Sequence, residues 1–61
     1  MIRAIIVDDE DASRMSLKAL LERYVSDVQI VAEAIDVESG LNTIKQFTPD
    51  LVFLDIQMPD G

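Results

Sequence analysis

Cysteine and histidine are both absent from this chain of 61 residues. Disulfides are therefore excluded, and so is a structural zinc site, which depends on these two residue types. A chain this short buries only about 60% of the surface that it exposes when unfolded, so its core must be thin. Domains of this size commonly need disulfides, metals or partners for stability. The supports that remain here are a hard cation with oxygen ligands or another protein chain.

Basic residues are also scarce. Lys and Arg number 5 against 12 Asp and Glu, which gives a net charge of −7. Binding to nucleic acid needs a basic patch that displaces counterions, so we expect no direct nucleic-acid contact in this segment. Hydrophobic residues make up 49% of the chain, which is the composition of a folded domain rather than of a disordered segment.

Long apolar runs are absent as well. The longest contain four residues, at positions 4–7 and 51–54, whereas about 20 are needed to cross a bilayer. The N-terminus lacks a long apolar segment followed by a small-residue cleavage site, so no signal peptide is expected. The lack of cysteine is compatible with the cytoplasm. We therefore expect a cytoplasmic protein that makes no contact with a membrane.

Three apolar runs, at residues 2–7, 28–34 and 51–54, predict buried strands. Strands that alternate with helices indicate an α/β fold with a parallel sheet, and the connections between parallel strands are right-handed. The strand order 1-2-3 would place both helices on one face, although the strands are apolar on both faces. The order 2-1-3 places one helix on each face. We therefore predict a β-α-β-α-β unit with the order 2-1-3.

Two amphipathic helices are predicted between the strands, because apolar residues recur there at helical spacing. The apolar stripes are Leu17, Leu20, Leu21 and Tyr24 in the first helix and Val37, Leu41, Ile44 and Phe47 in the second. Asp11 and Asp36 are the expected N-caps. Gly40 is expected to weaken the second helix, and Pro49 is expected to end it. Met15 and the stripe residue Tyr24 are expected to lie in the core.

Carboxylates follow two of the predicted strands. Asp8 and Asp9 end the first strand and Asp55 ends the third, and in the order 2-1-3 these strands are neighbours about 4.8 Å apart. If a later strand lies beyond the third, this is a switch point, where open α/β sheets bind ligands. Crowded carboxylates repel one another, so either one of them stays protonated or a divalent cation neutralises them. Carboxylate and carbonyl oxygens are the ligands of Mg²⁺ or Mn²⁺, and Asp55 beside such a cation has the chemistry to form an aspartyl phosphate.

The two segments that carry these acids resemble the receiver domain of two-component response regulators. They are IIVDDE at residues 5–10 and PDLVFLDIQMP at residues 49–59. An acidic pair after a strand is common by itself, whereas its conjunction with D-x-x-M-P at this spacing is specific. The resemblance covers the whole chain, and regulators with a LytTR-type DNA-binding domain are the most similar kind.

This resemblance implies a flavodoxin-like fold and a role for each matching residue. Asp55 would be the phosphoacceptor, which takes a phosphoryl group from the phosphohistidine of a sensor histidine kinase. Asp9 and Asp55 would bind Mg²⁺ directly, together with the backbone carbonyl of Gln57. Asp8 would contribute through metal-bound water, and residues 58–59 would shape the loop after the acceptor. The plainer interpretations are a strand-end turn for Asp55 and helix N-terminal charge for Asp8 and Asp9, and the joint motif favours the site.

A receiver domain is roughly twice as long as this chain. The Ser or Thr and the Lys that contact the phosphoryl group come from its fourth and fifth strands and have no counterpart here. We therefore expect residues 1–61 to be the N-terminal half of a receiver domain, which ends after the phosphoacceptor loop. We expect no enzymatic activity beyond its own phosphorylation and dephosphorylation.

Two other functions compete with phosphorelay signalling. One is a truncated receiver that does no chemistry and assembles with copies of itself through the open edge of the third strand, where backbone groups lack partners. The other is a phosphohydrolase with an aspartate nucleophile. Such enzymes resemble this chain in having an apolar strand that ends in Asp, but they have a second Asp two residues after the nucleophile. Here that position is Gln57 and the extra acids follow the first strand, so this function is disfavoured.

Overall fold

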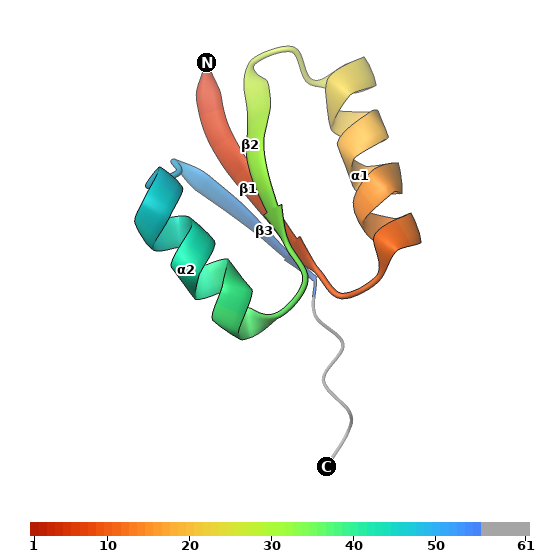
Figure 1. The fold of residues 1–61 in the computed structure, drawn as a ribbon. Helices are drawn as coiled ribbons and strands as arrows, with labels where there is room; N and C mark the ends of the chain where they lie inside the picture. The colour runs from red at the N-terminus through yellow and green to blue at the C-terminus, as the bar shows by residue number, and fades with distance from the viewer. Residues whose placement is uncertain (56–61) are drawn as a thin grey trace.

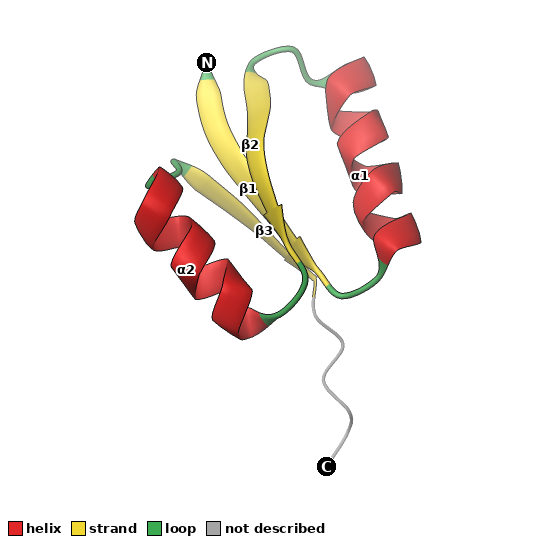
Figure 2. Cartoon of the chain, viewed as in Figure 1, coloured by secondary structure: helices red, strands yellow, loops and turns green. Residues whose placement is uncertain are grey.

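Two helices cover opposite faces of a three-stranded sheet in the computed structural model, which describes residues 1–55 (Figure 1). The elements in chain order are β1 (Ile2–Asp8), α1 (Asp11–Tyr24), β2 (Val28–Ala34), α2 (Val37–Phe47) and β3 (Leu51–Asp55). The strands lie in the order β2-β1-β3, and both neighbouring pairs are parallel. Figure 2 shows α1 and α2 on either side of the sheet. The predicted flavodoxin-like α/β arrangement is therefore confirmed.

The central strand β1 forms the core because it is covered on both faces. Its residues Ala4, Ile5 and Ile6 are completely buried, and Val7 is 1% exposed. Successive side chains of a strand point to opposite faces, so this continuous apolar run requires a helix on each side. The core cluster contains Ile5, Val7 and Ala34, packed against Val31, Ala32, Ile44 and Val52.

Gly40 allows α2 to approach β1 closely. A Cβ atom on Gly40 would stand 3.1 Å from both methyl carbons of Val7, and Gly40 itself is buried. The glycine that sequence alone identifies as a helix-weakening residue therefore has a packing role in the structure.

The register of β3 is fixed at its beginning by Asp50. The Asp50 amide donates to the Arg3 carbonyl at 2.8 Å, and the Arg3 amide donates to Asp50 Oδ2 at 3.0 Å. From there the pairing runs in step from Ala4 with Leu51 to Asp8 with Asp55. The hydrogen bonds at one end of the sheet thus determine which residues meet at the other end.

The helix ends agree with the sequence at α2 and differ at α1. Asp36 caps α2, where its Oδ1 accepts from the Ser39 amide at 2.7 Å, and Ser39 Oγ accepts from the Asp36 amide at 3.2 Å. The helix ends at Phe47, before Pro49, as predicted. The prediction of Asp11 as an N-cap is wrong: Glu10 holds that position without a side-chain cap bond, and Asp11 is the first helical residue.

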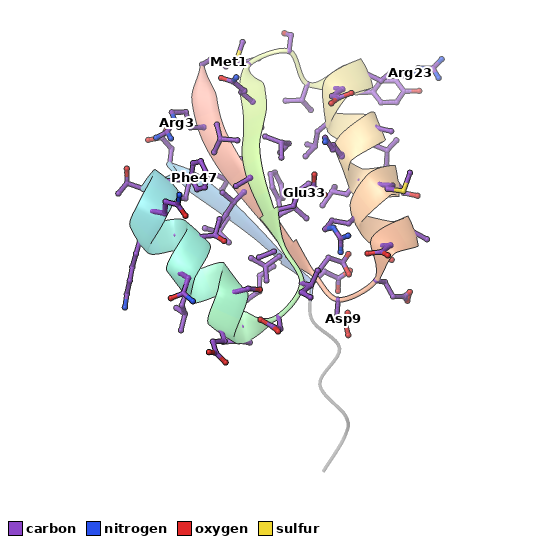
Figure 3. All side chains as sticks on the ribbon, viewed as in Figure 1. Met1, Arg3, Asp9, Arg23, Glu33 and Phe47 are labelled. Carbon is purple, nitrogen blue, oxygen red and sulfur yellow. The ribbon has the colours of Figure 1, made fainter. Side chains whose placement is uncertain are left out.

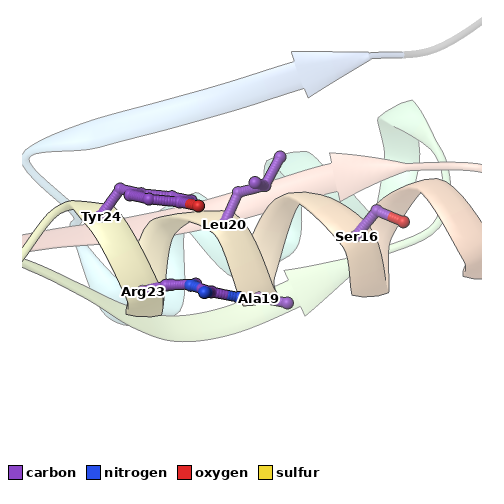
Figure 4. A pocket seen from close by; sticks show the side chains of 5 residues that line it. All are labelled: Ser16, Ala19, Leu20, Arg23 and Tyr24. Carbon is purple, nitrogen blue, oxygen red and sulfur yellow. The ribbon is translucent and has the colours of Figure 1, made fainter.

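The apolar stripe of α1 is only partly buried. Leu21 is 9% exposed, whereas Met15 is 69% and Tyr24 is 70% exposed, so the prediction that these two residues lie in the core is wrong. The exposed part of the helix carries a shallow pocket lined by Ser16, Ala19, Leu20, Arg23 and Tyr24 (Figure 4). The Arg23 guanidinium lies 5.5 Å from the centre of the Tyr24 ring. Neither helix within residues 1–55 is long and apolar enough to span a membrane.

Candidate functional site

Asp8 and Asp55 lie side by side at the carboxyl edge of the sheet. They are register partners on the adjacent parallel strands β1 and β3, where neighbouring chains run about 4.8 Å apart. Asp8 is 2% exposed and is the buried charged residue of the described part of the chain, whereas Asp55 is exposed. The structure therefore brings together the last residues of two strands, as the predicted topology requires.

Asp9 follows directly after β1, in the short connection to α1. Figure 3 labels it at the carboxyl edge, where the chain leaves the sheet. Its side chain is exposed, like that of Asp55, and within residues 1–55 neither of these carboxylates makes a hydrogen bond or an ion pair. As far as residues 1–55 are concerned, both carboxylates are exposed to a ligand from solvent.

The Asp8 carboxylate already has one local partner. Its Oδ1 accepts a hydrogen bond from the Glu10 amide at 2.9 Å, which makes a turn of the kind that Asp side chains form two residues onward. This bond explains how a charged group is tolerated at a buried position. An ionised carboxylate accepts about four hydrogen bonds, so Asp8 keeps acceptor capacity for a metal-bound water.

The arrangement suits Mg²⁺ in its chemistry and in the number of acids. Mg²⁺ usually keeps several waters and is bound through one or two carboxylates, rather than in a cage made only of protein ligands. Within residues 1–55, no group of three or more acidic side chains converges closely enough to make a metal site alone. The fourth predicted ligand, the carbonyl of Gln57, lies outside the described residues, as do residues 58–59.

A basic residue that sequence reasoning passed over stands beside this edge. Arg14 Nη1 donates to the Asp8 carbonyl oxygen at 2.9 Å, Arg14 Nε donates to Glu33 Oε1 at 3.1 Å, and a third bond joins Arg14 to Asp11. Lys18 Nζ donates to the other oxygen of Glu33 at 3.1 Å. Glu33 lies on β2 on the side that faces α1 (Figure 3). The available signals were a charged residue in an apolar strand and the Asp11–Arg14 spacing, which suits an ion pair on a helix.

These contacts shift two ionisation equilibria. The hydrogen bond from Lys18, followed by the attraction of Lys18 and the contacts of Arg14, holds the pKa of Glu33 below its ordinary value, and burial opposes this only in part. The pKa of Arg14 is raised, chiefly by its bond to Asp11 and further by Glu33. Glu33 and Arg14 therefore both stay charged at neutral pH.

A comparison with known families identifies the kind of domain. The family model described as "Response regulator receiver domain" matches residues 4–61. The chain belongs to this family. The predicted resemblance to receiver domains is therefore confirmed.

Known bacterial proteins align over almost the whole chain. "Sensory transduction protein LytT" of Bacillus cereus is 48% identical over 60 residues, which are 98% of this chain and 24% of that protein. "Transcriptional regulatory protein BtsR" of Escherichia coli K12 is 42% identical over 97% of this chain and 24% of that protein. The predicted likeness to LytTR-type regulators agrees with the presence of LytT among these relatives.

A third relative has a different described activity. "Protein-glutamate methylesterase/protein-glutamine glutaminase 2" of Nitratidesulfovibrio vulgaris is 44% identical over 97% of this chain and 16% of that protein. The chain thus spans about a quarter or less of the length of the relatives that it matches. The similarity concerns the receiver segment and not the activities named for the whole proteins.

Proposed function

We propose that this receiver accepts a phosphoryl group on Asp55 from the phosphohistidine of a sensor histidine kinase. The observation that carries the proposal is the pairing of Asp8 with Asp55 at the carboxyl edge of the sheet, in a chain of the receiver family. In this role residues 1–61 supply the acceptor and the cation ligands of the N-terminal half of a receiver domain. No reaction beyond phosphorylation and dephosphorylation of Asp55 is proposed.

The exposed carboxylate of Asp55 would act as the nucleophile. One of its oxygens attacks the phosphorus, a P–O bond forms, and the P–N bond to the imidazole breaks. The imidazole leaves with the electron pair and takes up a proton. Asp55 is suited to this step because its side chain, among the described residues, is not engaged by another group.

Three acids and one carbonyl are the proposed ligands of a magnesium ion. Asp9 and Asp55 would bind it directly with the carbonyl of Gln57, and Asp8 would hold a metal-bound water with its remaining acceptor capacity. A bound Mg²⁺, or Mn²⁺ in its place, would neutralise charge on the phosphoryl oxygens and on the acids around them. Without such a cation the negative phosphoryl group would approach three carboxylates, which repel it.

Phosphorylation of the full-length protein by a small phosphodonor tests the proposal. We expect acetyl phosphate with Mg²⁺ to add one phosphoryl group, detected by intact mass, and EDTA to prevent the addition. Asp55→Asn should abolish the labelling, whereas the matched control Asp27→Asn, at an exposed acid before β2, should leave it unchanged. Equal labelling of the Asp55→Asn protein would show that another residue is the acceptor.

A further inference from the structure

Arg14 connects three elements next to the acidic edge. From α1 it reaches the carbonyl of Asp8 at the end of β1 and the carboxylate of Glu33 on β2, and it pairs with Asp11 on its own helix. Its side chain is only 14% exposed, although it is long and charged. Burial of a guanidinium is costly unless its donors find acceptors, and these three acceptors engage each of its three nitrogens.

The bond to Asp8 matters for Asp9 because of peptide geometry. The Asp8 carbonyl, the Asp9 nitrogen and the Asp9 Cα lie in one peptide plane. The 2.9 Å bond from Arg14 Nη1 to the Asp8 oxygen therefore orients the unit from which the Asp9 side chain extends. The side chain of Asp8 is held as well, because its Oδ1 accepts a hydrogen bond from the Glu10 amide. Together the two bonds fix the direction in which the chain leaves β1.

The contact set also requires an arginine. A guanidinium presents several donors in a fixed plane, whereas a lysine ammonium is a point charge on a flexible stem. Glu33 is itself oriented by Lys18, which holds Oε2 at 3.1 Å while Arg14 Nε takes Oε1. Arg14 is thus held by Glu33 and Asp11 while it donates to the Asp8 carbonyl.

We infer that Arg14 is a positioning residue for the cation site: it orients the Asp8–Asp9 peptide so that the Asp9 carboxylate faces Asp55. The inference rests on the proposed function, because it assigns to Arg14 the orientation of a proposed ligand. Outer contacts that orient metal ligands typically change metal affinity by about 10- to 100-fold when they are removed.

A purely electrostatic role of Arg14 predicts the opposite sign. Removal of a positive charge beside a cation site should strengthen Mg²⁺ binding, since like charges repel. If Arg14 positions Asp9, its removal should weaken binding. Arg14→Lys separates the two roles again, because it keeps the charge and loses the planar set of donors.

Magnesium affinity of the unphosphorylated full-length protein, measured by titration calorimetry, provides the test. We expect Arg14→Ala to raise the Kd for Mg²⁺ at least about 10-fold and Arg14→Lys to restore little of the loss. The control is Arg23→Ala on the same helix, whose described contact is with Tyr24, and its Kd should match the wild type. Circular dichroism melting in EDTA establishes that each variant is folded.

The outcomes separate this inference from the proposed function. If the wild type binds no Mg²⁺, the proposed site itself is wrong. A second outcome is that the wild type binds Mg²⁺ and Asp9→Asn abolishes this binding, but folded Arg14→Ala binds Mg²⁺ as tightly as the wild type or more tightly. In that case only the role of Arg14 is overturned. If Arg14→Ala does not fold, the Kd values of Arg14→Lys and Glu33→Gln for Mg²⁺ test the inference instead. Glu33→Gln removes the negative charge of one acceptor of Arg14 and leaves a neutral amide oxygen in its place, so it should raise the Kd by about threefold. Wild-type affinity in both variants would contradict the inference.

Discussion

Gly40 of α2 lies directly over Val7 of β1, and a Cβ atom at Gly40 would come within 3.1 Å of both Val7 methyl carbons. Val7 is 1% exposed and cannot move away, and its β-branched side chain has few alternative rotamers. Gly40→Ala would gain about 1 kcal/mol of helix propensity but overpack the core at a cost of about 1–3 kcal/mol. We therefore expect a net loss of stability, measured as a lower urea midpoint.

Two comparisons isolate the contact with Val7. Gln46→Ala, at an exposed position of the same helix, should leave stability almost unchanged. In a Val7→Ala background the overpacking is relieved, so adding Gly40→Ala should stabilise that protein. A stabilising Gly40→Ala in the wild type would mean that helix propensity outweighs the close approach.

Glu33 should make the stability of the fold depend on pH in the acidic range. Its pKa is lowered from the ordinary value of 4.5, first by the hydrogen bond of Lys18. The unfolded chain therefore takes up a proton at a higher pH than the folded chain, and the contribution of Glu33 is fully present above pH 4.5 and is lost as the pH falls through the lowered pKa. We expect the free energy of unfolding of the wild type to exceed that of Glu33→Gln by about 0.5–1 kcal/mol at pH 7. This difference should vanish in acid.

Urea denaturation at a series of pH values measures this difference. Lys18→Ala provides the background control, because it removes the largest cause of the shift and should shrink the pH dependence of the Glu33→Gln effect. A difference between wild type and Glu33→Gln that is constant from pH 7 to about pH 3 would show that the charge of Glu33 does not contribute.

The fold followed from the sequence because its determinants are local and periodic. The central strand is apolar at Ala4, Ile5, Ile6 and Val7, which are all buried, and such a strand needs a helix on each face. This requirement alone selected the order β2-β1-β3. The same order predicted that Asp8 and Asp55 would be neighbours, because the last residues of adjacent parallel strands meet at one edge.

Helix periodicity was less informative about burial. It places Leu21 and Tyr24 on one stripe but does not say how far the sheet extends beneath it. In the structure Leu21 is buried and Tyr24 is 70% exposed. Periodicity thus predicts which residues share a face, and only packing decides which of them are covered.

Side-chain hydrogen bonds were the part of the site that the sequence did not reveal. The bond from the Glu10 amide to Asp8 turns the chain one residue earlier than expected, so Glu10 and not Asp11 precedes α1. The bond from Arg14 to Asp8 depends on the rotamer of a long side chain and on how α1 crosses β2. Self-association through β3 stays a prediction; within the described sheet β3 pairs with β1, and Leu54 on it is 68% exposed.

Asp8 combines a structural and a proposed ligand role, and two substitutions should separate them. Asp8→Asn keeps an oxygen that can accept from the Glu10 amide, which Asp8 Oδ1 now does at 2.9 Å, and it removes one of the mutually repelling charges. In EDTA we therefore expect its stability to equal or exceed that of the wild type. Asp8→Ala removes the acceptor of the Glu10 amide from the buried position of Asp8 and should cost about 1–2 kcal/mol.

Magnesium should reverse the ranking of Asp8→Asn and the wild type. A ligand that binds only the folded state stabilises it by mass action, so saturating Mg²⁺ should raise the melting temperature of the wild type and should have much less effect on Asp8→Asn. Melting curves with EDTA and with Mg²⁺ give both quantities from the same samples. An equal Mg²⁺-dependent rise in the two proteins would confine Asp8 to its structural role. The cation would then depend on the other proposed ligands, Asp9, Asp55 and the carbonyl of Gln57.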